Sequence, residues 1–184
     1  MIRIRLTPQP IETIPSFVAV SAFAVEEVPL GGLPGRLDAL LGGEASRMIQ
    51  EGRLSGRWNA QAMIASRGRV ASSYVLFAGL GTLQGLTLSA LSLRVEKILG
   101  RLLRTSARSI SLGVIGKGAR GAGFPAVAAE TVQGAMRALA GHPSDLDLTM
   151  CEPDPACYPE LVGVAERAAF RRAEERGLSL EVEV

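Results

Sequence analysis

The chain has few of the residues that several classes of functional site require. Of its 184 residues only two are cysteine and one is histidine, and aromatic side chains make up 4%. Two cysteines cannot build a disulfide framework, and a single histidine cannot build a histidine-rich metal site. Scarce aromatic rings count against binding of single-stranded nucleic acid, which relies on exposed stacking surfaces.

An excess of charge of one sign is also missing. The 20 lysine and arginine residues nearly balance the 18 aspartate and glutamate residues, which gives a net charge of +2. Acidic and basic residues are interleaved, without a basic tail or stripe, so we expect no nucleic-acid partner. Lysine is rare: Lys97 and Lys117 are the only two, and the arginine excess is typical of a GC-rich genome.

Long hydrophobic runs are absent as well. No apolar stretch approaches the length needed to span a bilayer. The N-terminal stretch MIRIRLTPQP alternates like an edge strand and lacks the apolar core of a signal peptide. These patterns predict a cytoplasmic protein with reduced thiols and no membrane partner. Hydrophobic residues make up 47% of the chain, and residues 1–184 show no break in composition, so we expect one domain with a large core.

What the chain does contain is a regular alternation of apolar runs and helical periodicities. Strands are expected at Ile2–Leu6, Phe17–Val25, Ala60–Ser66, Tyr74–Ala78, Ile110–Ile115, Leu146–Met150 and Leu178–Val184. Helices are expected from Leu37 to Ile49, from Thr87 or Ser89 to Arg104, from Pro125 to Leu139 and from Pro159 to Arg176. This alternation predicts an α/β fold with a mainly parallel central sheet and helices on both faces.

The most informative segment is SISLGVIGKGARGAGFPAVAAET, from Ser109 to Thr131. It predicts a buried strand, a glycine-rich loop and a helix with Pro125 in its first turn. Such a loop presents unpaired backbone N–H groups beside a positive helix end, which is where anions bind. The candidate site comprises Gly116, Lys117, Gly118, Ala119, Arg120 and Gly121, and the glycines Gly31 and Gly32 are expected to line the same cleft. The alternative is a tight turn whose glycines serve helix–strand packing.

Several other motifs are more simply explained by structure than by chemistry. Gly79-Leu80-Gly81 with Gly85 departs from the spacing of a dinucleotide-binding fingerprint. Cys151 and Cys157 match no standard zinc motif, and His142 lies in a turn after a helix. Trp58 is expected to anchor the edge of the core or to belong to an interaction surface. The arginines of the last helix (Arg167, Arg171, Arg172 and Arg176) are interleaved with glutamates, as on a solvated helix face.

Two segments resemble one family of enzymes. Tyr74–Arg104, YVLFAGLGTLQGLTLSALSLRVEKILGRLLR, resembles the N-terminal domain of the leucine aminopeptidase family, in which a strand ending in G-L-G precedes a helix. Leu33–Ile64 is similar to an earlier region of that domain, with its L-D-x-x-L-G-G helix. The resemblance extends over roughly Phe17 to Arg176. It implies a three-layer fold shared with macro domains, which bind ADP-ribose and related nucleotides.

The glycine-rich segment is similar to the macro-domain segment G-T-G-x-x-G-x-P. Gly116, Gly118, Gly121 and Pro125 lie near the corresponding places, with Lys117 where a small hydroxyl residue is usual and a longer loop before the proline. The early macro-domain motifs N-A-A-N and G-G-G-V-A are replaced by SAFAVEEVPLGGLPG. The resemblance therefore implies the fold more strongly than the ligand.

The catalytic half of the aminopeptidases has no counterpart here. Their metal-binding motifs, N-T-D-A-E-G-R and G-K-G-x-x-F-D-S-G-G, are absent, and Gly116-Lys117-Gly118 shares only three letters with the second. We expect no metal, no cofactor and no peptidase activity from this chain alone.

Two hypotheses follow from these features. The first is a non-catalytic aminopeptidase-type domain with a binding, regulatory or assembly role, whose partner is another protein or a second copy of the chain. The second is a macro-like domain that binds ADP-ribose or a related phosphate-containing nucleotide. A binder should have an open cleft at the carboxyl ends of the central strands, lined by Gly31-Gly32 and Gly116–Gly123. In a scaffold, side chains such as Leu33 or Phe124 should fill that cleft.

Overall fold

A seven-stranded sheet forms the centre of the molecule. The computed structural model describes residues 2–119, 121–140, 145–170 and 178–182. The strand order is β3-β4-β2-β5-β6-β1-β7, and every neighbouring pair is parallel except β3 and β4. The strands are β1 (Ile2–Thr7), β2 (Val18–Phe23), β3 (Gln61–Ala65), β4 (Tyr74–Gly79), β5 (Ser109–Gly113), β6 (Leu146–Cys151) and β7 (Leu178–Val182).

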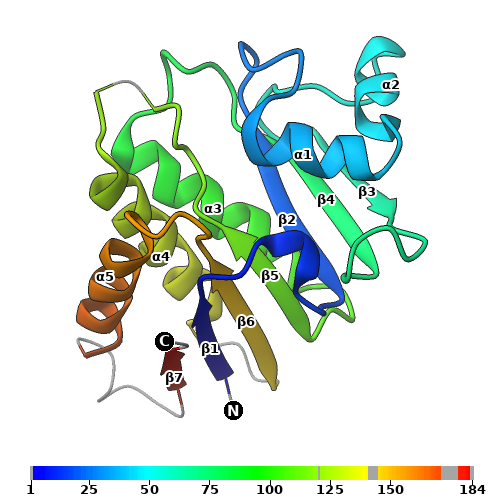
Figure 1. Cartoon of the computed structure of the whole chain (residues 1–184). Helices are drawn as coiled ribbons and strands as arrows, with labels where there is room; N and C mark the ends of the chain where they lie inside the picture. The colour runs from blue at the N-terminus through cyan, green and yellow to red at the C-terminus, as the bar shows by residue number, and fades with distance from the viewer. Residues whose placement is uncertain (1, 120, 141–144, 171–177, 183–184) are drawn as a thin grey trace.

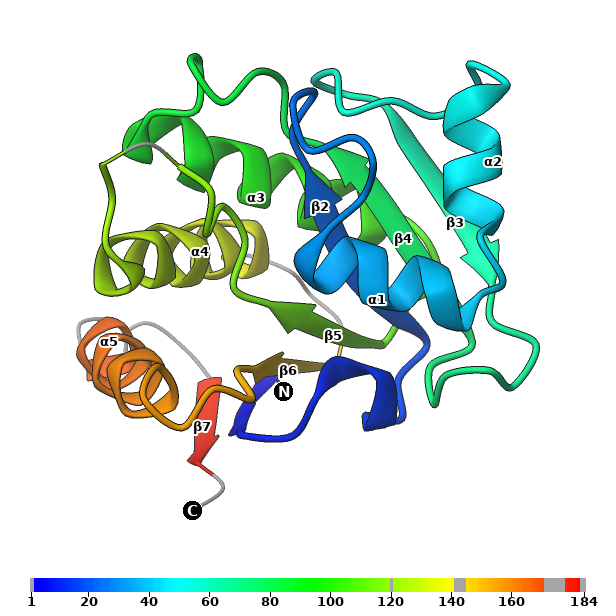
Figure 2. The ribbon, with the colours of Figure 1, turned by 45° about the horizontal axis from the view of Figure 1, so that its top comes forward.

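Helices cover both faces of this sheet and make three layers (Figures 1 and 2). One face carries α3 (Leu88–Leu102), α4 (Phe124–Leu139) and α5 (Tyr158–Phe170), and the other carries α1 (Gly32–Leu40) and α2 (Glu44–Gln50), with a 3-10 turn at Ile11–Thr13. The expected α/β fold with a mainly parallel sheet and helices on both faces is confirmed.

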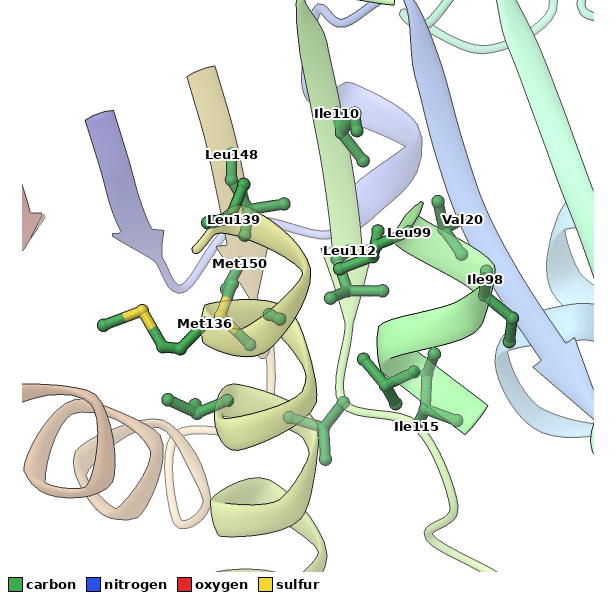
Figure 3. Packing of buried hydrophobic residues seen from close by; sticks show 14 of the residues in the cluster. Val20, Ile98, Leu99, Ile110, Leu112, Ile115, Met136, Leu139, Leu148 and Met150 are labelled. Atoms are coloured by element: carbon green, nitrogen blue, oxygen red, sulfur yellow. The ribbon is translucent and has the colours of Figure 1, made fainter. Parts of the chain in front are cut away.

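Alternation along the central strands divides the core in two. Val20, Leu112 and Met150 face α3 and α4, where they meet residues such as Leu99 and Met136 (Figure 3). Ala19, Phe23 and Phe77 point the opposite way and pack against α1 and α2. Because the central strands are buried on both faces, they appear in the sequence as nearly unbroken apolar runs.

The single helix expected from Leu37 to Ile49 is wrong. Gly42 and Gly43 both have positive φ and break it into α1 and α2. The buried carboxylate of Asp38 then accepts hydrogen bonds from the backbone N–H groups of Ala45 (2.8 Å) and Ser46 (3.3 Å), at the start of α2. A side chain of the first helix thus satisfies the N-terminal amides of the second.

The assignment of the N-terminal strand to an edge is also wrong. β1 lies between β6 and β7, with Ile4 opposite both Leu148 and Leu180. The strand alternates because one face packs on the core, while Arg3 and Arg5 on the other face are exposed and pair with Asp147 and Glu181. The last helix is observed to Phe170, and its expected continuation to Arg176 lies outside the described residues.

The connections after β2 and β5 determine where a cleft forms. These strands are parallel neighbours, but the chain leaves β2 towards α1 on one face and leaves β5 towards α4 on the other (Figure 2). The two connections diverge from the carboxyl edge of the sheet and leave a crevice between them. In open α/β sheets, ligands bind at such a switch point.

Candidate functional site

A cavity of about 520 Å³ occupies this crevice. Its size falls within the range of small-molecule binding sites. Its lining comes chiefly from the end of β2, the start of α1, the loop between β4 and α3, the loop between β5 and α4, and the end of β6. They contribute Ser21, Ala22, Gly31, Gly32, Leu33, Pro34, Gly113, Val114, Ile115, Gly116, Lys117, Gly118, Cys151 and Glu152, together with Glu27, Arg36 and several apolar residues.

The loop between β5 and α4 presents backbone N–H groups at one wall of the cavity. Gly116 has φ +85°, and the N–H of Ala119 donates to its carbonyl oxygen at 2.8 Å, so the chain turns sharply there. Within the described residues, the N–H groups of Gly116, Lys117 and Gly118 have no acceptor. The hydroxyl of Thr131 on α4 bonds both the N–H and the carbonyl of Ile115, each at 3.2 Å, and fixes the base of the loop.

The first turn of α1 forms a second wall of the same cavity. Gly31, Gly32, Leu33 and Pro34 all line it. The N–H of Gly35 donates to the carbonyl of Gly31 at 3.0 Å, whereas the N–H groups of Gly32 and Leu33 precede the first helical bond and have no acceptor in the described part of the chain. Two sets of amides without an acceptor, each with partial positive charge, therefore belong to residues that line one cavity.

The charged side chains around the cavity are mostly paired. Lys117 Nζ lies 2.6 Å from Glu152 Oε2, and Arg36 Nε lies 2.9 Å from Glu12 Oε1. Glu152 is 1% exposed, and its other carboxylate oxygen accepts a hydrogen bond from the N–H of Asp154 at 3.2 Å. Lys117 also lies over the ring of Phe124, 5.3 Å from its centroid.

Two buried polar side chains lie at the floor of the cavity. The hydroxyl of Ser21 is buried and has no hydrogen-bond partner in the structure. The thiol of Cys151 donates weakly to the carbonyl of Leu112 at 3.6 Å, and burial, followed by the charge of Glu152, raises its pKa to about 12. Cys151 is therefore a neutral thiol at physiological pH and a poor nucleophile.

The structure brings together five of the eight predicted site residues. Gly31, Gly32, Gly116, Lys117 and Gly118 all line the cavity. Of the remaining described residues, Ala119 is buried in the turn and Gly121 is exposed with φ +70°, and neither belongs to the lining. Arg120 lies outside the described residues.

Sequence reasoning missed Ser21, Glu27 and Glu152. Each stands in, or just after, a strand whose carboxyl end reaches the crevice. That position is the signal that would have identified them, because ligands of open α/β sheets bind beyond the carboxyl ends of the strands.

Side chains do not fill the cleft. Leu33 lines the cavity, with its Cδ2 lying against the backbone of Gly113, where an added Cβ would come within 2.7 Å of it. Phe124, the other residue expected to fill it in a scaffold, is not part of the lining and packs against Lys117.

Gly79 and Trp58 make packing contacts and are not part of the cavity lining. A Cβ on Gly79 would lie 2.0 Å from the carbonyl oxygen of Arg57, so this glycine permits two chain segments to touch. Trp58 is half-buried under the guanidinium of Arg94, which lies 5.5 Å from its ring centroid. The described residues contain no cluster of metal ligands and no helix long and apolar enough to cross a bilayer. His142, Arg171, Arg172 and Arg176 lie outside the described residues.

Comparison with solved structures identifies the architecture. A mutant macrodomain of Oceanobacillus iheyensis matches with a TM-score of 0.74 and 17% identity, covering 90% of this chain and 88% of that chain. The fold is that of a macrodomain. A Trypanosoma brucei macrodomain in complex with ADP matches with a TM-score of 0.69 and 15% identity, covering 88% of this chain and 67% of its own. No family model and no curated protein matches the sequence.

The resemblance to leucine aminopeptidases holds at the level of this macrodomain-like fold. A tomato leucine aminopeptidase matches with a TM-score of 0.65 and 14% identity, over 92% of this chain. The chain spans about a third of that enzyme, 36% of its length. Membership of the aminopeptidase family does not follow from a match at this identity.

Proposed function

We propose that this macrodomain-like chain binds ADP-ribose or a related phosphate-containing nucleotide in the cavity between β2 and β5. The observation that carries the proposal is that two sets of amides without an acceptor in the described residues belong to the lining of one open cavity. The loop at Gly116–Gly118 supplies one set and the first turn of α1 at Gly32 and Leu33 supplies the other. Backbone amides at a glycine loop and at a helix N-terminus suit the phosphates of a diphosphate.

The apolar part of the cavity fits the base of such a ligand. Leu80, Leu83 and Leu86 offer an apolar wall against which a base can pack. Structures of the macrodomains with the same fold include one from Oceanobacillus iheyensis with ADPR and one from Trypanosoma brucei with ADP. These ligands support the chemical class proposed for this chain.

A purely non-catalytic assembly role, as in an aminopeptidase-type domain, has less support. That role predicted a cleft filled by Leu33 or Phe124, and the cavity is open instead. We assign no catalytic residue.

Calorimetric titration with ADP-ribose, AMP and inorganic phosphate tests the proposal. Gly118→Val places a branched side chain on the cavity wall, and we expect it to abolish binding. The added Cβ would lie 3.0 Å from the end of the Glu27 side chain and 3.7 Å from Leu83 Cδ2, so the variant should fold. Gly123→Val is the matched control, because Gly123 belongs to the same loop but is not in the cavity lining. Equal affinity in the two folded variants would rule out the loop as a phosphate site.

A further inference from the structure

A carboxylate stands beside the glycine loop at the place where phosphate is proposed to bind. Glu27 Oε2 accepts a hydrogen bond from the N–H of Ala24 at 2.6 Å, which fixes the carboxylate in position. Its other oxygen lies only 3.0 Å from where a Cβ of Gly118 would be. Glu27 is half-buried and lines the cavity. One carboxylate oxygen therefore faces the tip of the loop whose amides are unpaired.

The neighbouring charges do not cancel this carboxylate. Lys117 is paired with Glu152, and Arg36 is paired with Glu12. Among the described residues, Glu27 forms no ion pair. The backbone amides thus attract an anion, while the unpaired carboxylate of Glu27, which lines the same cavity, repels one. The repulsion grows with each negative charge on the incoming group.

We propose that Glu27 selects ligands by the charge of the phosphate at the loop, favouring phosphates with a single negative charge over a terminal phosphate with two. This inference rests on the proposed function. In ADP-ribose each phosphate carries two ester or anhydride links and one negative charge. The terminal phosphate of ADP approaches two negative charges at neutral pH, because the second pKa of such a group is near 6. Glu27 should disfavour ADP more than ADP-ribose.

The test compares the dissociation constants of ADP-ribose and ADP for the wild type and Glu27→Gln. Glutamine keeps an oxygen that accepts the N–H of Ala24 and removes only the charge. At the dielectric constant of water, two unit charges about 5–6 Å apart interact by an amount equivalent to roughly threefold in affinity, and two negative charges on one phosphate double that free energy to roughly tenfold. We expect Glu27→Gln to strengthen ADP binding by about tenfold and ADP-ribose binding by about threefold, so the preference for ADP-ribose shrinks.

Glu26→Gln provides the matched control. Glu26 is the adjacent residue with the same charge, its carboxylate accepts the N–H of Leu83 at 2.9 Å, and it is exposed and not part of the cavity lining. We expect this variant to leave the ratio of the two dissociation constants unchanged. Raising the salt concentration should reduce the wild-type preference, because screening weakens repulsion at an exposed cavity mouth.

The outcomes distinguish charge selection by Glu27 from the proposed binding of a nucleotide. A larger gain for ADP than for ADP-ribose in Glu27→Gln, absent from Glu26→Gln, supports charge selection. Wild-type binding with the same ratio in Glu27→Gln overturns charge selection and leaves the proposed function intact. Failure of the wild type and of Glu27→Gln to bind either ligand overturns the proposed function, and the inference with it.

Discussion

Lys117 and Glu152 form an ion pair that joins the loop after β5 to the residue that follows β6, with 2.6 Å between Nζ and Oε2. The lysine side chain is 51% exposed and the glutamate side chain is 1% exposed. This asymmetry means that the pair chiefly compensates a buried carboxylate. Lys117, which the sequence predicted to bind a ligand, is therefore already paired with a buried carboxylate in the protein alone.

Removing this lysine should destabilise the fold. Lys117→Ala leaves Glu152 buried without its cation, which should lower the free energy of unfolding by about 1–3 kcal/mol. Urea unfolding measures the effect. Lys97→Ala is the control, because Lys97 is the only other lysine and is exposed on α3. Equal stability of the two variants would contradict a compensating role for Lys117.

The glycine that ends β4 should be required for packing. Gly79→Ala places a Cβ 2.0 Å from the backbone oxygen of Arg57, and this clash should cost about 3 kcal/mol of unfolding free energy. Gly100→Ala on α3 meets nothing within 4 Å and should stabilise by about 0.5–1 kcal/mol. Thermal melting of both proteins gives the comparison. A Gly79→Ala variant as stable as the wild type would show that the close approach is not rigid.

The unpaired hydroxyl of Ser21 should be dispensable for both stability and binding. Ser21→Ala removes a buried polar atom that has no partner in the described part of the chain, so the unfolding free energy should stay the same or rise by up to about 1 kcal/mol. The same change should leave ADP-ribose binding unchanged, because the hydroxyl is shielded from the cavity. Melting curves and calorimetric titrations measure the two effects. A destabilised variant, or one with weaker binding, would contradict this account of Ser21.

The two thiols should differ in reactivity. Burial raises the pKa of Cys151 to about 12, so almost none of it is thiolate at about pH 8.5, near the pKa of a free thiol. The pKa of Cys157 is also raised, first by burial and then by Asp154, but its side chain is partly exposed. Iodoacetamide should modify Cys157 first in the native protein and both residues in urea, as peptide mass spectrometry would show. Equal labelling of the native thiols would contradict the burial of Cys151.

Local patterns were sufficient to predict most elements of the fold. Thr87 was one of two expected caps for α3, and its side chain does accept the N–H of Ala90. Pro125 was placed in the first turn of α4, where it lies. The apolar run from Tyr74 to Ala78 predicted a strand, and β4 begins at Tyr74 and is buried from Val75 to Gly79.

The errors arose where distant residues decide the outcome. β1 is an interior strand because β7, which begins at Leu178, pairs with it from the far end of the chain. The residues of β1 and their immediate neighbours in the sequence do not indicate this pairing with β7. The break at Gly42 and Gly43 depends on their positive φ and on the carboxylate of Asp38, which caps α2. The spacing of apolar residues, from which one continuous helix was predicted, contains no information on either feature.

The candidate site was also predicted only where a local motif marks it. The glycine loop is such a motif, so Gly116 and Gly118 could be predicted from the sequence. Glu27 and Glu152 have no motif, and they reach the cavity only because β2 and β6 end at the same edge of the sheet. The pairing of Lys117 with a buried glutamate also required the structure.

Amide chemical shifts during titration with ADP-ribose test the central claim most directly. A ¹H–¹⁵N correlation spectrum resolves the N–H groups of Gly31, Gly32, Gly116 and Gly118 individually. If the cavity between β2 and β5 binds the nucleotide through these amides, their signals should shift saturably and more than those of Gly52 and Gly68, which lie in exposed turns outside the cavity lining. Saturable shifts elsewhere, or no shifts at all, would contradict the account.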